Sequence, residues 1–165
     1  MTGRVTRMVG ALACAASLCG CEPGLGETFA ASPCADRAPA EGPSRTLPAA
    51  PGRVRIVTSG YGDAQRDGLA APDGTVLLPR IYDALAPTGD PDLFAATCRA
   101  TDAIRSNEEG FVDADGREVI PPVFWEARRL EDGRYEVSRW VGFGPFERVR
   151  YMTLDAEGRV VEVRS

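Results

Sequence analysis

The sequence predicts an all-β fold in which tandem β-hairpin or three-stranded units repeat every 42 residues and form a small sheet array. The pattern is clearest over 110–127, which reads as a strand, an acidic-glycine turn, a second strand and a proline-led third segment. The same order occurs without a gap at 68–85 and in weaker form at 152–163. One hairpin cannot bury its apolar face alone, so a fixed period of this length indicates stacked copies with a shared core.

The turn of each copy pairs an acidic residue with glycine, at Asp73-Gly74, Asp115-Gly116 and Glu157-Gly158. A tight hairpin turn needs a positive φ, which glycine adopts without steric cost. Proline follows at Pro79 in the first copy and at Pro121-Pro122 in the second. Because proline cannot donate to a β-ladder, we expect these residues to end the second strand of the hairpin.

A further strand is predicted before each hairpin, over 53–58, 93–100 and 134–141, since apolar and polar residues alternate there. The segments that follow the first two hairpin turns, 81–86 and 124–130, could each carry a short turn of helix. The residues expected in the shared core are Leu77, Leu78, Ile81, Tyr82, Phe111, Val119, Ile120, Val123 and Phe124.

The central copy combines Gly-Phe-Val-Asp at 110–113, Asp-Gly at 115–116 and Glu-Val-Ile-Pro-Pro at 118–122. This arrangement resembles the WG-repeat family, whose units read roughly Trp-Gly-Phe-Ile-Asp-x-x-Gly-x-x-Val-Ile-Pro-Pro-x-Tyr-Asp. The resemblance covers about residues 53–165. It implies an all-β array, and it carries over no catalytic residue.

The copies depart from that family at the dipeptide that gives it its name. Asp67, Glu109 and Tyr151 stand where the family has tryptophan, and Met152 replaces the glycine of the last copy. The three copies are therefore degenerate units of such a repeat.

Residues 1–20 have the pattern of a signal peptide, because Arg4 and Arg7 precede a short apolar run at 8–18. That run is too short to span a bilayer as a helix, which takes about 20 residues. The quartet Leu-Cys-Gly-Cys at 18–21 resembles the lipobox of bacterial lipoproteins. The resemblance implies cleavage before Cys21, diacylglycerol on its sulfur and an acyl chain, such as palmitate, on its amine. A plain secretory signal with incidental cysteines is the alternative.

Residues 21–52 are expected to form a disordered tether that starts at the lipidated Cys21. Proline, alanine and glycine are frequent there, and no apolar periodicity is present. The β-repeat domain is expected over 53–165. The anchor would place it in the cell envelope on a bacterial membrane, facing the periplasm or the cell exterior.

Cys34 and Cys98 remain once the signal peptide is removed and Cys21 is lipidated. An even pair in an oxidising compartment is compatible with a disulfide. The alternative is a buried, unbonded Cys98 on a strand with Cys34 in the tether.

Composition excludes several kinds of site. The chain has no histidine, so Ser-His and Cys-His nucleophile pairs are ruled out and a closed zinc site lacks ligands. A formal net charge of -5 disfavours nucleic acid as a partner. The Asp113-x-Asp115-Gly116 segment lacks the remaining ligands of a calcium loop and is interpreted as a turn. No cofactor or metal is expected.

The least repeat-like stretch, 140–146, places Trp140, Phe143 and Phe146 among glycine and proline. These aromatics could form an exposed binding loop, or they could cap the open end of the array. We therefore expect a non-enzymatic binding or scaffolding role toward an envelope protein or glycan. An envelope hydrolase with paired carboxylates, and a structural module without a specific ligand, are the alternatives.

Overall fold

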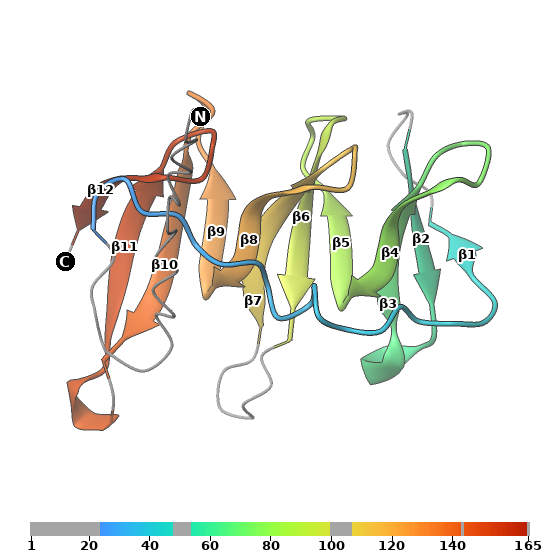
Figure 1. Cartoon of the computed structure of the whole chain (residues 1–165), viewed down its shortest axis with the longest axis horizontal. Helices are drawn as coiled ribbons and strands as arrows, with labels where there is room; N and C mark the ends of the chain where they lie inside the picture. Colours follow the sequence, from blue (N-terminus) through green and yellow to red (C-terminus); the bar gives the residue numbers. More distant parts are fainter. Residues whose placement is uncertain (1–23, 48–53, 100–106, 143, 165) are drawn as a thin grey trace, which may run out of the picture.

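The computed structural model describes residues 24–47, 54–99, 107–142 and 144–164. Within these residues twelve strands form three four-stranded antiparallel sheets, which follow one another in a row along the longest axis (Figure 1). Two short 3-10 helices, Gly62–Ala64 and Gly144–Phe146, lie in connecting segments. No helix in the described part of the chain is long and apolar enough to cross a membrane. The predicted all-β array of hairpin units is confirmed.

Each sheet is a meander in which strands that are consecutive in sequence pair side by side. Sheet A contains β1 (Arg45–Thr46), β2 (Arg55–Ser59), β3 (Arg66–Ala70) and β4 (Val76–Tyr82). Sheet B contains β5 (Ala84–Pro87), β6 (Leu93–Cys98), β7 (Glu108–Asp113) and β8 (Glu118–Phe124). Sheet C contains β9 (Glu126–Arg129), β10 (Tyr135–Val141), β11 (Arg148–Leu154) and β12 (Val160–Arg164).

The segments expected to carry a turn of helix, 81–86 and 124–130, are extended, and this corrects that prediction. β4 leads through Asp83 into β5, and β8 leads through Trp125 into β9, so the chain enters the next sheet within one residue. The N–H of Asp83 donates to the carbonyl of Thr97 (3.0 Å) and that of Trp125 to the carbonyl of Ser138 (2.9 Å). The extended form wins because it gives β6 and β10 a partner strand for their outer ladder groups.

The glycines of the predicted turns have positive φ: 92° at Gly74, 82° at Gly116 and 77° at Gly158. In the central copy the N–H of Gly116 donates to the carbonyl of Asp113 (3.0 Å), and the N–H of Asp113 donates to the carbonyl of Arg117 (2.9 Å). The same two bonds recur in the other copies. The turn prediction is confirmed.

The prolines do not end the second strand, which corrects that expectation. β4 continues through Pro79, and β8 continues through Pro121 and Pro122. The ladder shifts register opposite Gly68 and Gly110, where the missing proline N–H is tolerated. The glycines permit this close approach, since a Cβ on Gly110 would lie 2.3 Å from the carbonyl oxygen of Ile120.

Two apolar clusters fill the spaces between the sheets. The cluster between sheets A and B includes Leu69, Leu78, Ile81, Tyr82, Phe94 and Val112. The cluster between sheets B and C includes Phe111, Ile120, Phe124, Val137, Met152 and Leu154. Sheet B is thus buried on both faces. Of the predicted core residues, Leu77, Val119 and Val123 are only partly buried, and they pack against the edges of these clusters.

Residues 24–47, here called the N-terminal strap, run across the front of all three sheets from β12 to β1 (Figure 1). At one end, the N–H of Gly26 donates to the carbonyl of Val160 (2.7 Å), and the N–H of Val160 donates to the carbonyl of Glu27 (3.0 Å). At the other end, β1 pairs with β2 in antiparallel register. The strap therefore contacts both the first and the last sheet of the array.

The strap differs from the disordered tether that composition suggests for 21–52. Cys34 and Cys98 form a disulfide with their Cα atoms 5.9 Å apart, so of the two possibilities for this pair the structure has the bonded one. Arg37 Nη1 lies 2.6 Å from Asp83 Oδ2, and Phe29 packs edge-on against Phe124 with ring centroids 4.6 Å apart. These long-range attachments are invisible in the local composition. Residues 21–23 and 48–52 lie outside the described residues.

A buried polar contact also fastens the strap to sheet B. Glu118 Oε1 accepts hydrogen bonds from the hydroxyl of Ser32 (2.5 Å) and from that of Tyr82 (2.7 Å). Burial, together with the hydrogen bond to Glu118, raises the pKa of the Tyr82 hydroxyl. This hydroxyl stays protonated and donates, so we assign Ser32, Tyr82 and Glu118 a structural role.

Asp67 and Glu109, which stand at equivalent positions of the first two copies, join successive sheets. Asp67 is 1% exposed, and its Oδ2 accepts from the backbone N–H of Leu85 in β5 (3.0 Å). Glu109, 42 residues later, accepts from the backbone N–H of Ala127 in β9 (3.1 Å). In both cases a carboxylate satisfies a donor at the start of the following sheet.

Candidate functional site

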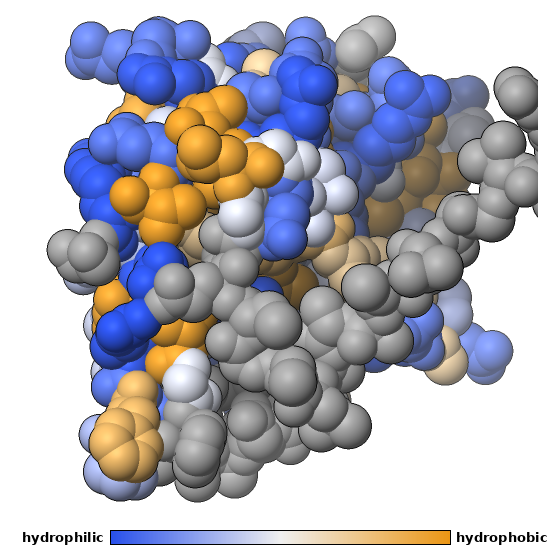
Figure 2. Space-filling model, turned by 60° about the vertical axis from the view of Figure 1, so that its left-hand side comes forward, coloured by the Kyte–Doolittle hydropathy of each residue, from blue (hydrophilic) through white to orange (hydrophobic). Residues whose placement is uncertain are grey.

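Sheet C is the last sheet of the described array, and Figure 2 turns the side of the molecule that carries it toward the viewer. We call the face of sheet C that points away from sheet B its outer face. Two of its residues, Ser138 and Thr153, are only 1% and 2% exposed, whereas other side chains on it reach the surface. On β10, Tyr135 and Val137 point into the cluster shared with sheet B, so the alternate residues Glu136, Ser138 and Trp140 point outward. On β11, Met152 and Leu154 point inward, so Val149, Tyr151 and Thr153 point outward by the same alternation.

Three aromatic side chains lie together at one end of this face. Tyr151 pairs with Ser138 and Val149 pairs with Trp140, which makes Tyr151 a diagonal neighbour of Trp140 on the same face. The Trp125 ring, at the junction of β8 and β9, lies 5.6 Å from the Trp140 ring, tilted by 49°. Trp125 is 41% exposed and Tyr151 is 43% exposed, while Trp140 is half-buried. We call Trp125, Trp140 and Tyr151 the aromatic platform.

A ladder of charged groups crosses the same face beside the platform. Glu136 Oε1 accepts from Arg128 of β9 (2.7 Å), and Glu136 Oε2 accepts from Arg164 of β12 (2.5 Å). The hydrogen bonds from Arg164 and Arg128 hold the pKa of Glu136 below its usual range. Thr153 Oγ1 donates to Glu162 (3.2 Å), which also faces Arg164 at 3.7 Å. The face therefore combines flat aromatic surface with a balanced set of fixed charges.

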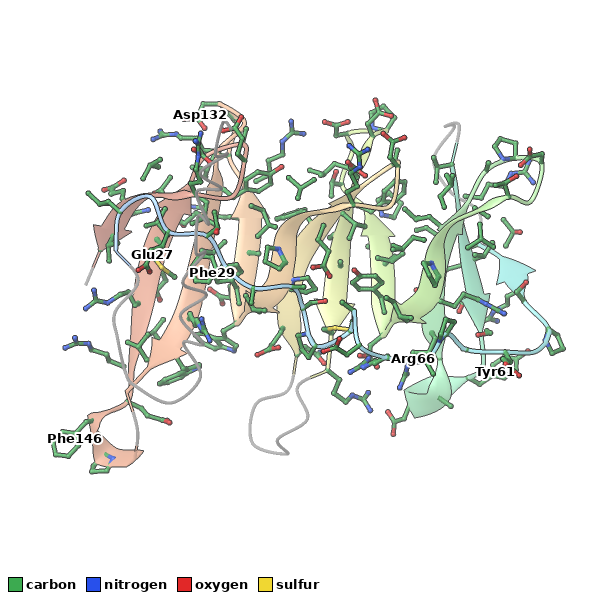
Figure 3. The ribbon with its side chains drawn as sticks, in the orientation of Figure 1. Glu27, Phe29, Tyr61, Arg66, Asp132 and Phe146 are labelled. Atoms are coloured by element: carbon green, nitrogen blue, oxygen red, sulfur yellow. A yellow bond between two sulfur atoms is a disulfide. The ribbon has the colours of Figure 1, made fainter. Side chains whose placement is uncertain are left out.

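The loop after β10 contains the aromatics that the sequence marks as a binding loop or a cap. Gly142 has φ 96°, and a Cβ there would lie 2.4 Å from the carbonyl oxygen of Phe146, so the loop is tightly turned. Phe146 is 74% exposed and projects at the tip of this loop, away from the sheets (Figure 3). Phe143 lies outside the described residues. Trp140 belongs to the aromatic platform, whereas Phe146 does not.

Several described carboxylates have structural partners. Asp113 Oδ1 accepts from the N–H groups of Asp115 (3.0 Å) and Arg117 (2.8 Å), as expected for a turn. Asp90 is hydrogen-bonded to Arg129 of β9 and to the N–H of Asp92, which lower its pKa. Among the described residues no group of three or more His, Cys, Asp or Glu side chains could hold a metal ion.

A shallow groove of about 470 Å³ lies beside the N-terminal end of the strap. Its lining includes Gly24, Leu25, Val161 and Val163. Leu25 is 72% exposed and Val161 is 44% exposed, so the groove presents apolar side chains beside Arg150 and Glu162. Gly24 lies three positions after Cys21, which is outside the described residues.

Two members of the aromatic platform were not singled out as site residues by the sequence. Tyr151 carries a signal, because it stands where the earlier copies have the acidic residues Asp67 and Glu109. Trp125 carries a similar signal, because Asp83 stands 42 residues earlier. Comparisons with protein-family models, curated proteins and solved structures found no match to this chain.

Proposed function

We propose that this chain is a lipid-anchored protein of the bacterial cell envelope, with a non-enzymatic binding or scaffolding role performed by a WG-repeat-like β domain. The observation that carries the proposal is the attachment of the strap to β12 at Gly26 and Glu27, close to the expected lipidation site. From Cys21 to Gly24 an extended chain spans at most about 11 Å. The lipid would therefore hold the array close to the membrane.

The surroundings of Gly24 support this arrangement. Leu25 and Val161 expose apolar side chains beside the point where the chain would leave for the bilayer. Burial of apolar surface in the lipid headgroup region would add to the anchor, since each buried methylene contributes about 0.8 kcal/mol. The attachment of the strap to sheets A, B and C would transmit the position of the anchor to the whole domain.

The binding role is supported by the exposed aromatic side chains Trp125 and Tyr151 on the outer face of sheet C. Extended hairpin arrays offer area to partners, and exposed aromatic side chains are frequent at binding sites. The hydrolase alternative needs a carboxyl group with a raised pKa beside a second carboxylate. The described carboxyl groups with a shifted pKa are Asp73, Asp83, Asp90, Asp132, Glu136 and Asp155, and each is lowered.

Metabolic labelling with palmitate tests the anchor. We expect the full chain to incorporate label and the Cys21→Ala variant to lose it. Cys19→Ala is the matched control, because it removes the neighbouring thiol and leaves the expected acceptor in place. Label retained on Cys21→Ala would sink the lipoprotein proposal.

A further inference from the structure

We propose that the outer face of sheet C binds a glycan, with the aromatic platform of Trp125, Trp140 and Tyr151 as the surface on which sugar rings stack. This inference rests on the binding role proposed above and names the class of ligand. The ligand is an uncharged or weakly charged polysaccharide of the envelope, made of pyranose rings that present a flat face of C–H groups.

The three rings of the aromatic platform are close enough together to form one stacking surface. Tyr151 and Trp140 are diagonal neighbours on one sheet face, and the Trp125 ring contacts the Trp140 ring at 5.6 Å. Rings on a pleated sheet are held by their strands, so little side-chain entropy remains to be lost on binding. Aromatic rings bind the C–H faces of sugars through dispersion and through the attraction of polarised C–H groups to the π-face.

The outer face of sheet C is unsuited to packing against another sheet or a second copy of the chain. In sheet B, Phe111 and Ile120 fill the cluster against sheet C. The residues 42 positions later, Thr153 and Glu162, are polar and hydrogen-bonded to each other. Packing a further sheet there would bury Glu162 and its ion-paired neighbours at a high desolvation cost. A ligand that is itself rich in hydroxyl groups avoids this cost.

The charged side chains on this face are paired with one another. Glu136 is shared by Arg128 and Arg164, and Arg164 also faces Glu162, so opposite charges alternate across the face. Such a balanced set has no strong attraction for a polyanion. It offers donors and acceptors at fixed positions beside the platform, as hydroxyl and acetamido groups of a sugar require.

The position of the platform also separates it from the membrane anchor. Val160, which is bonded to the strap, pairs with Leu154 at one end of β11. Trp140 pairs with Val149 at the other end of that strand. The platform therefore lies at the end of sheet C opposite the strap attachment, where a glycan chain can reach it.

The chain supplies its own reporter for a test. It contains two tryptophans, Trp125 and Trp140, and both belong to the platform. The full chain, purified in a detergent without sugar headgroups, is titrated with a β-1,4-linked tetrasaccharide of N-acetylglucosamine while tryptophan emission is recorded. We expect a saturable change in emission, and we expect Tyr151→Ala to weaken the affinity about tenfold or more.

Matched variants separate a site from a general effect. Tyr151→Phe keeps the ring and should bind like the wild type. Tyr61→Ala removes an aromatic that is 78% exposed at the other end of the array, and it should also bind like the wild type (Figure 3). Saturation-transfer NMR on the sugar C–H protons gives a readout that does not depend on tryptophan, and Trp125→Ala should reduce that signal.

Several results would overturn the inference. One is the absence of saturable binding in both measurements. Another is an equal loss of affinity in Tyr61→Ala and Tyr151→Ala. A third is quenching of both tryptophans by brominated lipid in vesicles carrying the protein, which would place this face against the membrane instead. Palmitate incorporation is unaffected by all of these variants, so failure of the glycan site stays distinguishable from failure of the anchor.

Discussion

Sheets B and C are built from the same four-strand meander, yet sheet B packs apolar clusters on both faces and sheet C packs one on a single face. The difference is visible at positions 42 residues apart. Phe111 and Ile120 of sheet B are buried against sheet C, whereas Thr153 and Glu162 of sheet C are polar partners on the outer face. The outward positions of the repeat therefore become polar in the last described sheet, as expected of a capping repeat.

Sheets B and C also differ at the repeat position held by Asp67, Glu109 and Tyr151. Asp67 and Glu109 each accept a backbone N–H from the following sheet. Tyr151 occupies the equivalent position in sheet C, and no described strand follows β12. Among the described residues, a carboxylate at position 151 would face no backbone N–H of a following sheet, and Tyr151 is 43% exposed there.

Loss of the last repeat copy should have the largest effect on the stability of the domain. Deleting residues 152–165 takes away Met152, Leu154 and Val160 from the cluster that covers sheet B. We expect the whole domain to unfold, because each large apolar side chain buried there contributes about 1.5–3 kcal/mol. Far-UV circular dichroism and thermal melts of the full and truncated chains provide the measurement. A truncated chain with a full β spectrum and a sharp melt would show that the copies are independent.

A turn that packs on its neighbour should be more sensitive than one in open space. Gly116 has positive φ, and a Cβ there would lie 2.5 Å from the carbonyl oxygen of Leu77 in sheet A. We expect Gly116→Val to destabilise the domain by about 1–3 kcal/mol. Gly74→Val is the control, since Gly74 shares the positive φ but has nothing within 4 Å of a Cβ. Denaturant melts should rank Gly116→Val as the costlier change, and an unchanged midpoint would contradict the turn assignment.

The bond between sheets can be tested at Glu109. Glu109→Ala leaves the N–H of Ala127 without its acceptor, and we expect a loss of about 1–2 kcal/mol of unfolding free energy. Glu109→Gln keeps an acceptor oxygen and should cost less. Tyr151→Phe, at the equivalent position in sheet C, should keep the free energy of unfolding within about 0.5 kcal/mol of the wild type. Equal effects at both positions would remove the distinction between internal and terminal copies.

Asp83, between sheets A and B, and Trp125, between sheets B and C, should differ in their effect on stability at low pH. At Asp83, burial alone would raise the pKa, but the hydrogen bonds from Arg37 and from the N–H of Arg99 lower it below its usual value. A carboxylate with a depressed folded pKa stabilises the fold above its unfolded pKa and loses that contribution as pH falls through the folded pKa.

Melts below about pH 4, near the ordinary pKa of aspartate, provide the measurement. Asp83→Asn should flatten the decline in stability with falling pH relative to the wild type. Trp125, the equivalent residue between sheets B and C, carries no titrating group, so Trp125→Phe should leave that decline unchanged. A wild-type slope in Asp83→Asn would mean that other groups control the acid response.

The repeat, its turns and most of its core could be predicted because the evidence for them is local and recurs at a fixed period. The path of Pro79 and Pro121 through a continuous strand could not, because it depends on the register shift opposite Gly68 and Gly110. The strap was missed for a related reason. Its proline-rich composition reads as unstructured, while its attachments to Glu118 and Asp83 join residues far apart in sequence.

The candidate site was predictable only in part. Trp140 stood out because its surroundings break the repeat. Tyr151 and Trp125 join it through cross-strand register and through the change of sheet at residue 125. Neither relation can be obtained from one sequence without the arrangement of the strands.

The strap also imposes an order on assembly. It is the first described segment to be synthesised, yet its bonds to β12 need the last described strand. The strap can therefore bind sheet C only after β11 and β12 are available, however early the other sheets fold. Such nonlocal closure is slow relative to hairpin formation. During synthesis the strap emerges first and must wait for β12, so the described domain becomes fully closed only after this strand has been made.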